Sequence, residues 1–123
     1  DGEEETLIEY SRSESALCID LTKSSLDPCV EYTYYTMFFR SEGKNPSVER
    51  QVAPLHLRKD EPLQLSVFID RSIIEVYANH RQCLTQRIYP TRPDSKGIVF
   101  YSKKGTVTVD RLQVWDIAAT NPW

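Results

Sequence analysis

The sequence predicts an all-β fold, a single domain built as a two-sheet antiparallel β-sandwich. Apolar and polar residues alternate with a period of two through most of the chain, whereas the helical period of 3.6 is nearly absent. Turn-forming residues separate the alternating segments at short intervals, as at 41–46 and 103–105, which is typical of sandwiches and barrels. The length of 123 residues, 40% of them hydrophobic, is enough to bury one core.

The expected strands follow one another along the whole chain. They are Thr6–Ser11, Ala16–Thr22, Val30–Phe39, Val48–His56, Leu63–Asp70, Ile73–Ala78, Cys83–Tyr89, Ile98–Ser102 and Thr106–Ile117. In the last strand the alternation of Val107 and Val109 is out of phase with that of Leu112 and Val114. This break in phase predicts a β-bulge or a corner where the strand passes to the other sheet.

The residues around Arg71-Ser72 allow a strand register to be predicted. If these two residues form a hairpin loop, apolar residues face each other in pairs, namely Ile69 with Ile74, Val67 with Val76 and Leu65 with Ala78. A three-residue loop would set Ile69 against Glu75, so the two-residue loop is favoured. We expect this apolar face to lie in the core, and side-chain hydrogen bonds from Asp70 or Ser72 to hold the turn.

The opposite face of the same hairpin mixes aromatic and acidic residues, Phe68, Asp70, Glu75 and Tyr77. It is either a half-exposed sheet face with one salt bridge or a surface that docks another domain. Asp70 and Glu75 are also the nearest acidic pair to consider for general acid–base catalysis, which needs two carboxylates flanking the reacting bond and one raised pKa. Phe68, not Asp70, lies opposite Glu75, and no pocket is indicated. We therefore predict no catalytic residue, and an ion pair of these acids with Arg71 or Arg87.

Composition argues against several classes of partner. The formal net charge of −3 gives no attraction to nucleic acid or to anionic membranes, and no apolar run approaches the roughly 20 residues of a membrane span. The cysteines, Cys18, Cys29 and Cys83, lack Cys-x-x-Cys spacing, which favours buried thiols over disulfides. His56 and His80 lie far apart in the sequence, so neither a metal site nor a cofactor is predicted.

Other motifs that could mark a functional site are either explained by local structure or do not occur. Asp27-Pro28 is explained by turn chemistry, and Asn45-Pro46-Ser47 cannot accept a glycan because proline occupies its middle position. Neither a Gly-x-Ser-x-Gly elbow nor a glycine-rich phosphate loop occurs. The aromatic residues of the third segment could stack on sugar rings, but strand packing gives the same pattern and is favoured; they are Tyr32, Tyr34, Tyr35, Phe38 and Phe39.

The segment from Leu65 to Asn79 resembles the signature stretch of the C-terminal module in glycoside hydrolase family 32, the β-fructofuranosidase, invertase and fructanase family. That stretch reads as an apolar strand, Asp-Arg-Ser, two apolar residues, Glu, and an aromatic residue followed closely by Asn. The resemblance continues at Thr85–Thr91, Asp94–Ile98 and Leu112–Asp116, and upstream at Glu4–Tyr10 and Leu17–Leu21. It is strong over residues 63–117 and looser over 23–56.

The resemblance implies one half of a two-domain enzyme. A five-bladed β-propeller would carry the catalytic residues in Asn-Asp-Pro-Asn, Glu-Cys and Arg-Asp-Pro contexts, and a sandwich with concanavalin-like jelly-roll topology would pack behind it. None of these contexts occurs here, since Arg92-Pro93-Asp94 has a different order. Residues 1–123 are therefore interpreted as the non-catalytic sandwich module, with the propeller absent. The parent enzyme would cleave β-fructofuranosidic bonds with retention and without a metal or organic cofactor.

The resemblance also implies strands before Thr6–Ser11, so we expect the module to be incomplete at its N-terminal side. Either the domain is cut short or another polypeptide supplies those strands, and an open sheet edge would favour association. The expected partners are the propeller of the parent enzyme and further copies of the chain through the sandwich. The alternative function is a free-standing, lectin-like sandwich that binds carbohydrate. A secreted adhesion module is less favoured because paired cysteines are not evident. The compartment is not determined, with an extracellular or periplasmic location slightly favoured.

Overall fold

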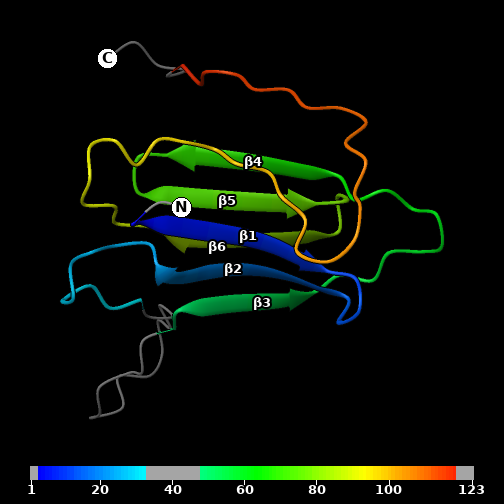
Figure 1. Cartoon of the computed structure of the whole chain (residues 1–123), viewed down its shortest axis with the longest axis horizontal. Coiled ribbons are helices and arrows are strands. Elements are labelled where there is room, and N and C mark those ends of the chain that lie inside the picture. Colours follow the sequence, from blue (N-terminus) through cyan, green and yellow to red (C-terminus); the bar gives the residue numbers. More distant parts are fainter. Residues whose placement is uncertain (1–2, 33–47, 119–123) are drawn as a thin grey trace.

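The computed structural model describes residues 3–32 and 48–118, and this part of the chain contains six strands and no helix. The strands are β1 (Glu5–Ser11), β2 (Ala16–Lys23), β3 (Arg50–Pro54), β4 (Leu65–Asp70), β5 (Ile73–Ala78) and β6 (Gln82–Arg87). They form two antiparallel sheets with the orders β1-β2-β3 and β4-β5-β6 (Figure 1). The predicted fold class, an all-β sandwich of two sheets, is confirmed.

The first sheet is organised by the alternation in β2. Leu17, Ile19 and Leu21 are each at most 1% exposed, because every second side chain of a strand points to the same face. β1 pairs with β2 so that Ile8 lies opposite Ile19, with a register shift near Glu5. β3 pairs along the other side of β2 and is shorter than the predicted segment Val48–His56.

The second sheet has the predicted register. Ile69 lies opposite Ile74, Val67 opposite Val76 and Leu65 opposite Ala78, which confirms the two-residue loop Arg71-Ser72. Arg71 has a φ of 51°, as a tight hairpin turn requires. The hydroxyl of Ser72 accepts a hydrogen bond from Arg87 Nη1 at 3.4 Å, and its carbonyl accepts one from the N–H of Ile88 at 2.8 Å. Ser72 is therefore bonded to the end of β6 rather than across the turn, so the side-chain bonds expected to hold the turn stay a prediction.

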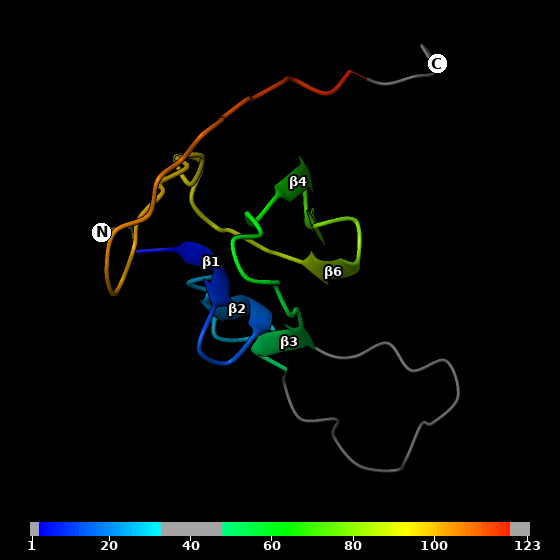
Figure 2. The same cartoon turned by 90° about the vertical axis from the view of Figure 1, so that its right-hand side faces the viewer.

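The core lies between the two sheets, which face each other in Figure 2. Its buried residues are Leu17, Ile19, Leu21, Tyr32, Ala53, Leu55, Ile74, Val76, Ala78, Leu84 and Ile88. β6 is the strand that contacts β2 and β3, so it joins the two layers. β4 is the strand of the second sheet farthest from the first sheet (Figure 2).

The expectation that the whole apolar face of the hairpin is core is wrong for β4. Val67 is 40% exposed and Ile69 is 49% exposed, whereas Val76 and Ile74 opposite them are 0% and 3% exposed. All six residues of β4 are exposed. Because the first sheet is joined to the second through β6, no strand of the first sheet contacts β4.

The segment after residue 97 also differs from the prediction. Ile98–Ser102 and Thr106–Ile117 form no strand, so the predicted bulge or corner has no strand in which to occur. All their large apolar residues are exposed, namely Ile98, Val99, Phe100, Tyr101, Val107, Val109, Leu112, Val114, Trp115 and Ile117. A strand needs a neighbour to pair its backbone, and among the described residues none lies alongside this segment. Figure 2 shows the segment, in orange and red, running away from the sheets.

The predicted strand Val30–Phe39 falls largely outside the described residues. Its first three residues, 30–32, are described and are not a strand. Of the aromatic residues considered as a sugar platform, only Tyr32 is described; it is buried, and its ring lies 6.3 Å from that of Tyr89. This supports core packing for Tyr32, while the other four lie outside the described residues. None of the described residues belongs to a helix long and apolar enough to cross a membrane.

Candidate functional site

Asp70 and Glu75, the acidic pair singled out from the sequence, lie on an open face of the second sheet. Phe68 is opposite Glu75 and Asp70 is opposite Ile73, as predicted. The expected ion pair with Arg71 or Arg87 is not formed, since no salt bridge among the described residues includes either acid. Arg87 is directed instead to Ser72, across the end of the hairpin.

Two cavities of about 170 and 190 Å³ lie elsewhere in the molecule. The first is lined by residues of the segment 21–32 and by Glu49, and the second by Glu5, Leu7, Asp20 and Lys23. Neither is lined by Asp70 or Glu75. Both are smaller than the roughly 300–1,000 Å³ of typical ligand pockets, so neither suggests a site for a sugar.

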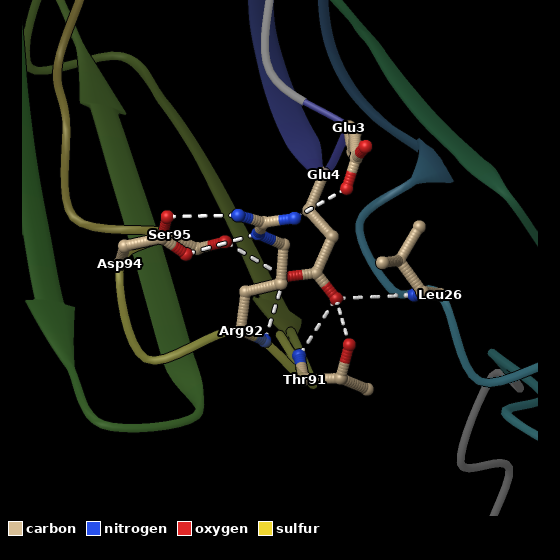
Figure 3. Close-up of polar contacts among 7 residues, drawn as sticks. All are labelled: Glu3, Glu4, Leu26, Thr91, Arg92, Asp94 and Ser95. Atoms are coloured by element: carbon tan, nitrogen blue, oxygen red, sulfur yellow. Dashed lines mark hydrogen bonds and ion pairs between the residues drawn. The ribbon is translucent and has the colours of Figure 1, made fainter.

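The densest polar contact surrounds the carboxylate of Glu4, at the beginning of the first sheet (Figure 3). Its Oε1 accepts hydrogen bonds from the N–H of Leu26 at 3.1 Å, from the N–H of Thr91 at 2.7 Å and from the Thr91 hydroxyl. Its Oε2 accepts from the N–H of Arg92 at 3.0 Å and from the Ser95 hydroxyl at 2.7 Å. One side chain thus ties together three segments that are distant in the sequence. We call this set of contacts the Glu4 clamp.

Five donors converge on one carboxylate, which determines its protonation. Partial desolvation raises the pKa of Glu4, but the hydrogen bonds from the hydroxyls of Thr91 and Ser95 and from the N–H groups of Thr91 and Arg92 together outweigh it. The net result is a pKa well below the usual range for glutamate. The carboxylate of Glu4 is therefore charged near neutral pH and holds these segments together by hydrogen bonds. It cannot serve as a general acid at that pH.

Arg92 completes the clamp from the other side (Figure 3). Its Nε and Nη2 each lie 2.9 Å from one carboxylate oxygen of Asp94, and its Nη1 bonds Glu3. This two-point pairing raises the pKa of Arg92 and lowers that of Asp94. Arg92-Pro93-Asp94, set aside in the sequence because of its order, is thus a surface loop whose charges pair with each other.

A second charged cluster crosses the three strands of the first sheet. Arg50 of β3 lies 3.1 Å from Asp20 of β2 and 3.8 Å from Glu9 of β1, and Lys103 bonds Glu9 from the segment after residue 97. Burial raises the pKa of the neighbouring Cys18 thiol, which accepts a 3.7 Å contact from Arg50. These opposite charges neutralise one another in pairs, so the cluster stabilises the sheet face rather than presenting a reactive group.

A third polar arrangement fixes the turn from β5 to β6. Asn79 and His80 have φ values of 49° and 52°, and mirror-image hairpin turns need such positive values in succession. The Asn79 side chain accepts a hydrogen bond from the N–H of Gln64 at 2.9 Å and donates to Glu61 at 3.0 Å. Glu61 in turn pairs with Arg81 at 2.7 Å. Asn79 therefore holds the loop before β4 against this turn.

The metal-ligating residue types do not gather in the described part of the chain, where no group of three His, Cys, Asp or Glu side chains could hold an ion. His56 and His80 are both exposed. All three cysteines are free thiols, as favoured, but only Cys18 is buried. The expectation of buried thiols is wrong for Cys29 and Cys83, which lie in a turn and on the outward side of the edge strand β6, where the sheets do not cover them.

The comparison with known proteins identifies the class to which this sandwich belongs. Residues 1–116 match the family described as the C-terminal domain of family 32 glycosyl hydrolases, and the chain belongs to that family. No solved structure matches the chain significantly.

The similar curated proteins are plant enzymes. The chain is 30% identical to the beta-fructofuranosidase, insoluble isoenzyme 5, of Oryza sativa subsp. japonica over 83% of its own length and 17% of that protein's. It is 31% identical to a fructan 1-exohydrolase of Aegilops speltoides over 80% of its own length and 15% of that protein's. It is 30% identical to the fructan 6-exohydrolase of Beta vulgaris over 82% of its own length and 15% of that protein's. The chain thus spans only about a sixth of the length of these relatives.

Proposed function

We propose that residues 1–123 form a non-catalytic sandwich module that supports the catalytic domain of an enzyme cleaving β-fructofuranosidic bonds in sucrose or fructans. The observation that carries this proposal is the short share of the relatives that the chain covers, between 15% and 17%. The geometry agrees with a supporting role. Asp70 and Glu75 lie on an open sheet face, and the charged carboxylate of Glu4 holds chain segments together.

The face of the hairpin that carries Phe68, Glu75 and Tyr77 is the surface we propose for docking the catalytic domain. The rings of Phe68 and Tyr77 lie 5.8 Å apart at an angle of 86°, and both side chains are more than 40% exposed. Two large apolar rings in contact at a surface are favourable sites for a protein partner. The Tyr77 hydroxyl is protonated at neutral pH and can donate to a partner, and the charge of Glu75 raises its pKa further.

Carbohydrate binding is a second candidate, because the same pair of rings is exposed. Stacking on a sugar requires the flat face of a ring to be open. In an edge-to-face pair such as Phe68 and Tyr77, the edge of one ring covers one face of the other. The pair therefore has fewer open faces than two separate rings would have, which favours a protein partner over a sugar. Titration of the chain with sucrose, inulin and levan, followed by tyrosine fluorescence, separates the two, since saturable binding lost in Tyr77→Ala would favour the lectin-like function.

The proposed role is tested first on the 123-residue chain. Incubation with sucrose, inulin or levan should release no fructose, because Asp70 and Glu75 line neither cavity, and the cavities that do have two carboxylates in their lining are only about 170 and 190 Å³. Turnover that disappears in Asp70→Asn or Glu75→Gln would overturn the supporting role.

The docking face is tested in the parent enzyme. Phe68→Ser combined with Tyr77→Ser should lower the thermal midpoint of the catalytic domain, while its KM for sucrose stays unchanged. Val52→Ser, at an exposed apolar residue of β3 in the first sheet, serves as the control. An unchanged midpoint in the double variant would remove this face as the docking surface.

A further inference from the structure

Two separate links join the sheets within the described part of the chain. The first is β6, the only strand of the second sheet that contacts strands of the first. The second is the loop after β6, residues 88–96, which is bonded to the beginning of β1 by the Glu4 clamp (Figure 3). This second link consists of contacts to one carboxylate rather than of a paired strand. It can therefore open while the ladders of both sheets remain intact.

A third segment takes part in the second link, namely the turn after β2, residues 24–32. The N–H of Leu26 donates a hydrogen bond to Glu4 Oε1 at 3.1 Å. The hydroxyls of Thr6 and Ser24 lie 2.6 Å apart, and Ser24 is only 2% exposed. Two contacts thus attach this turn to the beginning of β1, and one of them is made by a buried side chain.

The turn after β2 also contacts the loop after β6 directly. The aromatic rings of Tyr32 and Tyr89 are stacked, with centroids 6.3 Å apart and planes at an angle of 28°. Each of three segments therefore touches both of the others. We call this triangle of contacts the three-segment junction, and its members are the beginning of β1 (residues 3–6), the turn 24–32 and the loop 88–96.

A triangle of contacts makes its members depend on one another. When two segments are already held to a third, their own contact forms at a lower cost in conformational entropy. Conversely, the loss of one contact weakens the others, because the segments that they join become freer to move. Interactions within one network are non-additive for this reason. Native proteins open locally in such cooperative units, at a lower free energy than global unfolding.

We propose that the three-segment junction is a conformational latch, in which the Glu4 carboxylate makes the turn 24–32 and the loop 88–96 open and close together. Glu4 is central because its carboxylate accepts hydrogen bonds from both segments. When the latch opens, the link at β1 is lost, while the strand pairs and the contacts of β6 remain. The proposal concerns the sandwich alone, so it can fail or hold independently of docking to a catalytic domain.

Native-state amide hydrogen exchange in the 123-residue chain, followed residue by residue by NMR, tests the latch. The amides of Leu26, Thr91 and Arg92 should share one degree of protection in the unchanged chain, although they belong to two segments. In Glu4→Gln an NH₂ group replaces one acceptor oxygen, so part of the clamp loses its acceptor. The exchange of all three amides should then rise by a common factor of about ten.

The sharpest variant is Ser24→Ala, which changes the turn after β2 and is measured in the loop after β6. It removes the hydrogen bond between Ser24 and Thr6. The exchange of the Thr91 and Arg92 amides should nevertheless rise about fivefold, which corresponds to the loss of one hydrogen bond.

Thr22→Ala is the matched control for the loss of a hydroxyl group. The Thr22 hydroxyl donates to Asp20 at 2.5 Å, which lies outside the junction. This variant should leave the exchange of the Thr91 and Arg92 amides unchanged. An effect of Ser24→Ala that is confined to the turn 24–32 would overturn the latch, because the segments would then open separately.

The amide of Val76 reports the sheets, since β5 pairs with a strand on each side. In the unchanged chain this amide should be more strongly protected than the three amides of the junction, because the latch opens while the sheets stay folded. Equal protection of all four amides would mean that the junction opens only in global unfolding, which excludes the latch. Faster exchange of Thr91 and Arg92 in Glu4→Gln without a change at Leu26 would exclude it as well.

Discussion

β4 and β5 have the same pattern and opposite environments. Both alternate apolar and polar residues, and they pair residue for residue across the hairpin. Yet Val76 of β5 is fully buried, while Val67 opposite it is 40% exposed. The difference is the position in the sheet, because β5 lies between two strands and, among the described residues, β4 pairs with a strand on one side only. The alternation of apolar and polar residues therefore predicts which face of a strand is apolar. The neighbouring elements determine whether that face is buried.

The largest expected effect tests this contrast directly. Val76→Asp should prevent folding, because an unpaired carboxylate in an apolar interior costs several kcal/mol, a large share of the roughly 5–15 kcal/mol that stabilises a domain. Val67→Asp should cost less than about 1 kcal/mol in the monomer, since its carboxylate stays hydrated at the open edge. Urea unfolding at low protein concentration measures both variants. Equal losses would mean that β4 is covered in solution.

The sequence predicts those features of the fold that the alternation of apolar and polar residues determines by itself. The register of the hairpin follows from matching Ile69 with Ile74 and Val67 with Val76, because any slip turns an apolar side chain outward. The all-β class follows from the same alternation repeated along the chain. The segment Thr106–Ile117 also alternates, with one change of phase, and forms no strand, since pairing depends on a neighbour that local pattern does not specify.

The Glu4 clamp could not be predicted from the sequence for a different reason. Three of its five donors are backbone N–H groups, those of Leu26, Thr91 and Arg92, and any residue other than proline carries such a group. The donors also come from positions up to 91 residues away along the chain. Only the arrangement of the sheets brings them together, so no motif signals the clamp.

The second-largest expected effect concerns the Glu4 clamp, which joins the beginning of the first sheet to the loop after β6. Glu4→Gln should lower the urea midpoint at pH 7, because the amide keeps one acceptor oxygen in place of two charged ones. The pKa of Glu4 is lowered in the folded protein, so its stabilisation is fully present above the unfolded pKa of about 4.3 and is lost as the pH falls toward the folded pKa. The difference between the two proteins should therefore be constant above about pH 5 and shrink below about pH 4. A difference independent of pH over this range would show that the charge of Glu4 does not stabilise the fold.

The smallest expected effect concerns Arg71, at the turn that joins the exposed strand β4 to the buried strand β5. Its φ of 51° is unfavourable for a residue with a Cβ, and no ion pair among the described residues compensates for it. Arg71→Gly removes that strain of about 1–2 kcal/mol and adds a backbone entropy cost of roughly 0.5–1 kcal/mol, which leaves a small net stabilisation. Arg71→Ala keeps the strain and should change the unfolding free energy by less than about 0.5 kcal/mol. Urea melts of both variants beside the unchanged chain resolve this order. A loss above about 1 kcal/mol in Arg71→Ala would instead mean that the guanidinium has a partly buried partner in solution, and would restore the ion pair that the sequence suggested.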